Sequence, residues 1–129
     1  MKKLIVIAFM LLGFVSNVSA EPAPPTSFWE IEYIGSTDYP YWEDVFGSQT
    51  STVENHGGTV EATIIIVGYS SNIVLTYNGS PMSLYHTQGI DLNDDNIYDA
   101  WRYYYISSGP SGYMQLIDSG IVKDSIFVK

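Results

Sequence analysis

Apolar and polar residues alternate along several short stretches of this chain, as they do in half-buried β-strands. Residues 28–34 form the first such stretch, with one face made of Trp29, Ile31 and Tyr33 and the other of Phe28, Glu30, Glu32 and Ile34. Residues 63–67 are apolar at nearly every position, which predicts a central strand covered on both faces. Asn78-Gly79 separates apolar runs at 73–77 and 80–86 and predicts a hairpin, because both turn positions need a positive φ.

Three further strands are predicted toward the C-terminus, at residues 101–106, 113–117 and 124–128. Together the stretches amount to about seven short strands with turn residues between them, so we predict an all-β fold, either an antiparallel β-sandwich or an open barrel. The alternation at 101–105 predicts that Trp101, Tyr103 and Tyr105 face the core. Residues 35–58 lack a period and predict a long irregular connection, with a short helical turn at 42–46.

The N-terminus has the three parts of a secretory signal peptide in the required order. Lys2 and Lys3 precede an apolar run at 4–15, and small residues end at Ala20. This run is shorter than the roughly 20 residues that a membrane-spanning helix needs, so no membrane insertion is expected. We therefore predict a signal peptide at 1–20, a proline-rich leader at 21–27 and a single β domain at 28–129, secreted or periplasmic.

Composition narrows the range of partners. The chain has no cysteine, so no disulfide framework stabilises it despite its predicted export. Its formal charge is −9, and without the two lysines of the signal peptide three basic residues face 14 acidic ones, a charge of −11. Such a field repels phosphate backbones and attracts cations, which argues against nucleic acid as a partner.

One acidic segment, residues 91–99, has the spacing of a calcium loop. Oxygen-bearing side chains stand at its positions 1, 3, 5 and 9, and a backbone carbonyl at position 7; these residues are Asp91, Asn93, Asp95, Asp99 and Ile97. Calcium takes about six to eight hard oxygen ligands, and the spacing resembles the loops of EF-hand, dockerin and thrombospondin type 3 modules.

Two departures from that pattern bear on affinity. Asn96 replaces the glycine at position 6, and asparagine tolerates the left-handed turn required there. Arg102 replaces the bidentate glutamate at position 12, which removes two oxygens and predicts a weak site with a Kd of about 10⁻⁴ to 10⁻³ M. The alternative is an acidic, solvated turn without metal.

The long connection holds the other candidate site residues. Tyr39, Tyr41 and Trp42 are predicted to form a ligand platform, for example for sugar rings. His56 is included as a ligand-binding candidate, and with the carboxylates Glu43, Asp44 and Glu54 it would form the centre of a small hydrolase. The alternative is a turn in which the glycines after His56 permit a positive φ. No catalytic residue is assigned from the sequence.

Short motifs across the exported chain resemble the YolA-type family of small secreted bacterial proteins. They are Ala23-Pro24-Pro25, Trp42-Glu43, Thr50-Ser51-Thr52, Asn55-His56-Gly57-Gly58, Val67-Gly68-Tyr69 and Asp124-Ser125-Ile126. The resemblance implies export, a compact domain and no known activity. It nominates Trp42, His56, Gly57 and Gly58 as family positions without giving them roles.

These observations lead to one expected function and two alternatives. We expect a secreted, non-enzymatic β domain, stabilised by calcium, that binds a glycan or protein ligand at the cell surface. The alternatives are a small secreted hydrolase that uses the loop carboxylates and His56, and a carbohydrate-binding module.

Overall fold

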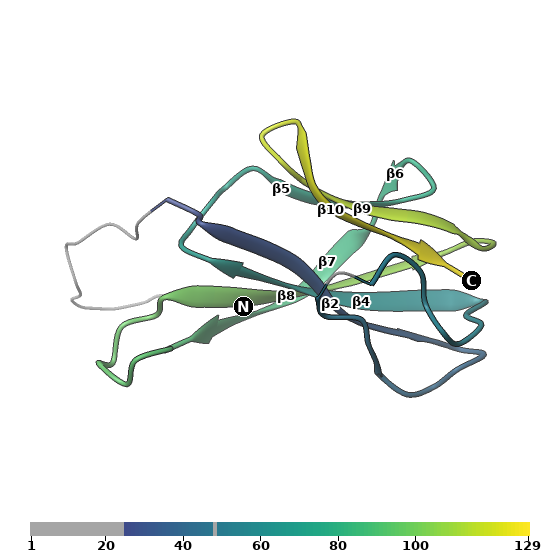
Figure 1. Ribbon diagram of the computed structural model, residues 1–129, viewed down its shortest axis with the longest axis horizontal. Helices are drawn as coiled ribbons and strands as arrows, with labels where there is room; N and C mark the ends of the chain where they lie inside the picture. Colours follow the sequence, from purple (N-terminus) through teal and green to yellow (C-terminus); the bar gives the residue numbers. More distant parts are fainter. Residues whose placement is uncertain (1–24, 48) are drawn as a thin grey trace.

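The structure is a computed structural model that describes residues 25–47 and 49–129 (Figure 1). The predicted signal peptide and residues 21–24 of the proline-rich leader lie outside the described residues. Nine strands are present in the described part: β2 (Phe28–Ser36), β3 (Glu43–Asp44), β4 (Thr59–Val67), β5 (Ile73–Tyr77), β6 (Ser80–Pro81), β7 (Ser83–Ile90), β8 (Ala100–Ser108), β9 (Gly112–Asp118) and β10 (Ile121–Val128). In residues 25–47 and 49–129 no helix is long and apolar enough to cross a membrane.

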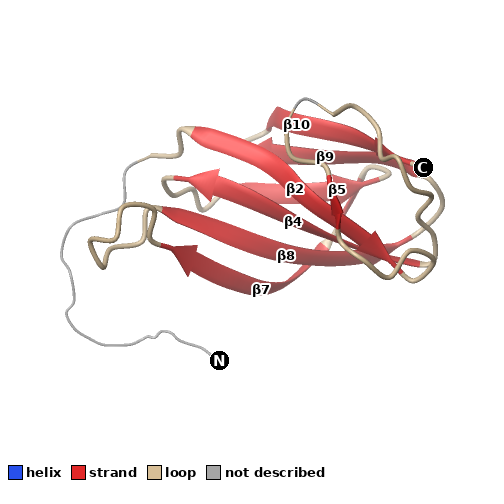
Figure 2. Cartoon of the chain, turned by 60° about the horizontal axis from the view of Figure 1, so that its bottom comes forward, coloured by secondary structure: helices blue, strands red, loops and turns tan. Residues whose placement is uncertain are grey.

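The strands form two antiparallel sheets that face each other (Figure 2). One has the order β10-β9-β5-β6 and the other β3-β2-β4-β8-β7, and the sheets do not close into a barrel. The predicted all-β class and the sandwich architecture are confirmed, while the open barrel is not found. Seven strands have five or more residues, in line with the predicted number.

Apolar side chains from both sheets fill the space between the layers. Ile64 and Ile66 of β4 are fully buried, as are Leu75 of β5 and Leu116 of β9. Tyr103 and Tyr105 belong to the same core and Trp101 packs against it, which confirms the predicted orientation of β8. The central position of β4 between β2 and β8 agrees with its apolar sequence.

A β-bulge corrects the simple alternation predicted for β2. The register with β4 shifts between Ile31 and Tyr33, so Ile31 and Ile34 both reach the core although they differ in parity. Glu32 is buried on the outer side of the sheet, where Arg102 binds it through two nitrogens at 2.7 and 2.8 Å. This ion pair raises the pKa of Arg102. Glu30 has a different partner, the Gly47 N–H, which donates to its Oε2 at 3.0 Å.

One other local prediction is wrong, and another is confirmed only for the turn itself. No helical turn forms at 42–46; instead β3 adds a two-residue edge strand to β2. The Asn78-Gly79 turn does form, with φ values of 53° and 82°, but its second strand β6 has only two residues. After Met82, whose side chain belongs to the core, the chain crosses to the other sheet as β7.

Candidate functional site

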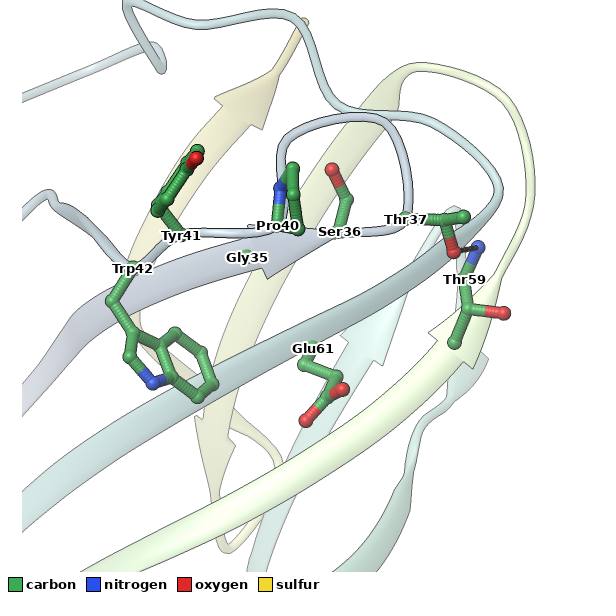
Figure 3. Close-up of a pocket in the computed structure, with 8 residues that line it drawn as sticks. All are labelled: Gly35, Ser36, Thr37, Pro40, Tyr41, Trp42, Thr59 and Glu61. Carbon is green, nitrogen blue, oxygen red and sulfur yellow. Dashed lines mark hydrogen bonds between the residues drawn. The ribbon is translucent and has the colours of Figure 1, made fainter.

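A pocket lies at one end of the five-stranded sheet, where β2 ends and β4 begins (Figure 3). Its volume is about 390 Å³. Backbone, hydroxyl, aromatic and carboxylate groups line it, from Gly35, Ser36, Thr37, Pro40, Tyr41, Trp42, Thr59 and Glu61. A small number of polar groups within an aromatic concavity is typical of small-ligand sites.

Two exposed aromatic residues form the rim of this pocket. Tyr41 is 69% and Trp42 is 47% exposed. The Trp42 ring lies over Gly35 because that position has no side chain: a Cβ there would meet the Tyr41 carbonyl oxygen at 3.0 Å and the indole at 3.4 Å. Tyr39 packs edge-on against Tyr41 on one side and against His56 on the other, with ring centroids 5.5 Å apart in each pair.

Behind the rim, the carboxylate of Glu43 is surrounded by donors. Its Oε2 accepts the Val53 N–H at 2.7 Å, and its Oε1 accepts the Glu54 N–H at 3.1 Å and lies 2.9 Å from His56 Nε2. Desolvation acts to raise the pKa of Glu43, but these hydrogen bonds outweigh it and the pKa falls below its ordinary value. Glu43 therefore holds the segment around 53–56 against β3.

His56 connects this carboxylate to the pocket wall. Its side chain is fully buried, and its Nδ1 lies 2.9 Å from Ser36 Oγ. Because a carboxylate only accepts, Nε2 carries a proton and donates to Glu43, while Nδ1 and the Ser36 hydroxyl share the second hydrogen bond of the ring. Ser36 Oγ in turn accepts the Tyr39 N–H at 3.0 Å.

The glycines after His56 have the conformational role that the alternative interpretation assigned to them. Gly58 has a φ of +77°, and a Cβ on Gly57 would collide with the Asp38 carboxylate. The His56 N–H donates to the Lys129 carbonyl at 2.6 Å, which ties the turn to the C-terminus.

The hydrogen-bonded set Ser36–His56–Glu43 has the residue types of a nucleophile, a base and an acid. Acyl transfer also needs N–H donors that are free to stabilise an oxyanion. In this loop the N–H groups already donate internally: those of Ser36, Thr37, Asp38, Tyr39 and Tyr41. In Figure 3 the Ser36 oxygen points away from Trp42 and Glu61. The arrangement is suited to bracing the pocket.

The acidic loop between β7 and β8 lies at the opposite end of the same sheet (Figure 2). One carboxylate oxygen each of Asp91, Asp95 and Asp99 lies within 4.8 Å of the other two. Asp91 accepts the backbone N–H groups of Asn93, Asp95 and Asn96. Desolvation opposes these bonds, yet they hold the pKa of Asp91 below its ordinary value. Asn96 has a φ of +67°, as expected for its place in the loop.

Asn93 lies in the middle of the three carboxylates. One atom of its amide is 2.8 Å from an Asp95 oxygen, 3.1 Å from Asp91 Oδ1 and 3.2 Å from Asp99 Oδ2. With the amide nitrogen in this place, Asn93 donates to the surrounding carboxylates and both ends of the amide are satisfied. Ile97 enters the cluster through its N–H, which donates to Asp95 Oδ1 at 2.9 Å.

The four predicted ligand-binding residues take two different positions relative to the pocket. Tyr41 and Trp42 line it, whereas Tyr39 and His56 lie behind its wall. Of the carboxylates suggested for His56, only Glu43 binds it through its side chain: Glu54 contributes an N–H to Glu43, and Asp44 accepts from Phe46.

Sequence reasoning missed six of the eight residues that line the pocket: Gly35, Ser36, Thr37, Pro40, Thr59 and Glu61. Glu61 was the one with a signal, an acidic residue beside the apolar run of β4.

A second hollow of about 350 Å³ lies beside β5, β7 and β8. Its lining is aromatic, aliphatic and hydroxyl-bearing, without a charged side chain, and consists of Tyr69, Ser70, Ser71, Ile73, Leu84, Thr87, Trp101, Tyr103 and Tyr105. The pocket at Trp42 differs from it in having the carboxylate of Glu61.

The family model for the Domain of unknown function (DUF4879) matches residues 21–122. The chain belongs to the DUF4879 family. The matched region includes both the pocket and the acidic loop of this DUF4879 domain. No curated protein and no solved structure matches the chain. Membership agrees with the expected assignment to an uncharacterised family, and its description gives no activity.

Proposed function

We propose that this DUF4879 protein is a secreted, non-enzymatic domain that binds a small ligand or a terminal group of a larger one in the pocket at Trp42. The observation that carries the proposal is an exposed Tyr41–Trp42 rim above a concavity with a fixed rear wall. Large aromatic faces left in solvent next to a preformed pocket favour binding, because ring stacking then costs little conformational entropy. We also propose that the family kinship is of the YolA type, whose motifs include Trp42 and His56.

An array of cell-surface oligosaccharides, followed by calorimetry on the hits, tests pocket binding. We expect at least one glycan to bind the parent protein and to bind Trp42→Ala at least tenfold more weakly. Tyr113→Ala is the matched control, since Tyr113 is 60% exposed on the other sheet. A blank array, or equal binding by the parent and Trp42→Ala, would count against a carbohydrate ligand in this pocket.

We propose that calcium binds the acidic loop and has a structural role. The support is the convergence of Asp91, Asp95 and Asp99 with the amide of Asn93 between them. Like charges at this separation repel unless a cation or a donor lies among them. Coordination by Asn93 would turn its oxygen toward the ion, so the loop has a state with the ion and a state without it.

Thermal unfolding in 10 mM calcium and in chelator tests this role. With a Kd of about 10⁻⁴ to 10⁻³ M, calcium at this concentration stabilises the native state by about 1.4 to 2.7 kcal/mol. For a domain of this size the melting temperature rises by roughly 5 to 15 °C. An unchanged melting temperature would end the calcium proposal and leave pocket binding untouched.

A hydrolase is the second candidate, because Ser36, His56 and Glu43 form a hydrogen-bonded set. We assign this set a structural role, because the backbone N–H groups around Ser36 already donate within the protein and the His56 ring is buried. A fluorophosphonate probe, which labels activated serines, is expected to leave Ser36 unmodified. Stoichiometric labelling at Ser36 that disappears in His56→Ala would overturn this assignment.

A further inference from the structure

The pocket at Trp42 combines an indole ring with a carboxylate. Trp42 and Glu61 both line it, and in Figure 3 their side chains project to the same side of the strands. An aromatic face and a carboxylate both attract positive charge, the first through its quadrupole and the second through its ionic charge. A neutral sugar needs only the aromatic ring and hydroxyl partners, so the carboxylate adds a preference for a positively charged ligand.

Glu61 is held in place without being neutralised. The Tyr85 hydroxyl donates to its Oε1. Burial, together with the carboxylate, raises the pKa of Tyr85 to about 12, so the phenol remains a neutral donor near pH 7. Among the hydrogen bonds of the described residues, none uses Glu61 Oε2. This oxygen therefore keeps its capacity to accept from a ligand.

Arg102 and Lys123 of the described part are engaged elsewhere, Arg102 with Glu32 and Lys123 with the Trp29 ring. In the described part, the Arg102 guanidinium pairs with Glu32 and the His56 ring contacts Glu43, and neither contact includes Glu61. Among the described residues, no cation is ion-paired with Glu61, so its carboxylate is open to a cation from another molecule.

The protein already uses the same pair of groups once, with an internal cation. Lys123 Nζ lies 4.2 Å from the centroid of the Trp29 ring, whose N–H donates to Asp118 at 2.8 Å. Hydrogen bonds and the nearby Lys123 charge outweigh desolvation and lower the pKa of Asp118. Trp42 and Glu61 again place an indole and a carboxylate around one space, the pocket, but no cation of the described residues is paired with this carboxylate.

We propose that the pocket selects a ligand that carries an ammonium group, bound between the Trp42 ring and the Glu61 carboxylate. The inference rests on the proposed binding function and specifies its ligand class. Both an amino sugar and a lysine side chain offer this chemistry. The charge of −11 on the exported chain raises the local concentration of either one.

Calorimetry with two pairs of probes tests the selection. The first pair is a glucosamine hexamer and its fully N-acetylated counterpart; the second is the peptide Gly-Lys-Gly and its Nε-acetylated form. We expect the amine of at least one pair to bind at least tenfold more tightly than its acetylated partner, and the favoured pair identifies the source of the ammonium. Trp42→Ala should abolish binding.

Glu61→Gln is the decisive variant, because it removes the charge and keeps an oxygen for Tyr85. We expect it to lose the tenfold preference for the amine. Asp94→Asn changes the net charge equally at the far end of the sheet, at a residue whose φ of +62° suits asparagine, and should keep the preference. If Asp94→Asn lost it to the same extent, the effect would be bulk attraction and the inference would fail.

Two further outcomes separate this inference from the function on which it rests. Equal or tighter binding of the acetylated probe, abolished by Trp42→Ala, would overturn ammonium selection and leave pocket binding in place. Binding of no probe by the parent protein, together with a blank oligosaccharide array, would overturn both.

Discussion

Carboxylates at the two ends of the five-stranded sheet have opposite surroundings: donors at one end and other carboxylates at the other. At the β2–β4 end, Glu43 lies within hydrogen-bonding distance of Val53, Glu54 and His56, and the loop is complete without any other molecule. At the β7–β8 end, Asp91, Asp95 and Asp99 lie within 4.8 Å of one another in an exposed loop. The first carboxylate is satisfied by donors of its own chain, whereas the three aspartates lie close together around the amide of Asn93.

The comparison shows why a count of acidic residues says little about function. Glu43 is buried, and its oxygens accept hydrogen bonds from donors of its own chain. Glu61, at the same end, is fixed by one neutral donor and remains negative. A carboxylate is available to a ligand only when the protein leaves its charge uncompensated.

The largest effect is expected from Glu43→Gln. Glutamine keeps one acceptor oxygen but brings an NH₂ group against the donors of residues 53, 54 and 56, so at least one buried N–H loses its partner. The cost is about 2 to 4 kcal/mol, which lowers the melting temperature by roughly 10 to 20 °C. The adjacent Asp44→Asn is the control and should shift it by less than about 3 °C. Similar shifts for the two variants would contradict the role given to Glu43.

The contribution of Glu43 also has a defined pH dependence. Its pKa in the folded protein lies below the ordinary value of 4.5, so the unfolded chain takes up a proton first as the pH falls. The stabilisation is complete above that ordinary value and is lost as the pH falls through the folded pKa. The gap in melting temperature between the parent and Glu43→Gln should be constant from about pH 7 to 5 and shrink below about pH 4. A difference in melting temperature that grew as the pH fell would contradict a lowered pKa of Glu43 in the folded protein.

Asp95→Asn should act in opposite directions with and without calcium. In chelator it removes a repelling charge while keeping an acceptor for Ile97, so the melting temperature should stay the same or rise by up to roughly 5 °C. In 10 mM calcium the variant should lose most of the stabilisation given by the ion. Asp94→Asn, outside the three converging aspartates, should retain the calcium response. If Asp95→Asn lowered the melting temperature as much in chelator as in calcium, Asp95 would stabilise the loop through its hydrogen bonds and not by binding calcium.

The smallest effect is expected from a change at Gly35, the residue over which the Trp42 ring lies. Gly35→Ala places a methyl group where the Tyr41 carbonyl and the indole ring now meet the backbone. We expect a decrease of a few degrees in melting temperature, about 1 kcal/mol, and weaker binding of any ligand that requires Trp42. Tryptophan fluorescence quenching by acrylamide should increase as the ring is displaced. Unaltered quenching and unaltered affinity would show that the ring does not depend on position 35.

The sequence by itself determined the all-β class, because apolar periodicity and Asn-Gly or glycine-containing turns are local signals. It also determined the convergence of Asp91, Asp95 and Asp99, since all three belong to one nine-residue segment. It did not determine the bulge at Glu32 or the crossing after Met82, which depend on how strands far apart in the chain pair and pack.

The pocket was decided only by the tertiary structure. Gly35, Trp42 and Glu61 come from three different segments and meet because β2 pairs with both β3 and β4. The contact of His56 with Glu43 likewise needs the turn after residue 52 to fold back on β3. Side chains within one loop are placed by local geometry, whereas groups from separate strands are brought together only by the register of the sheet.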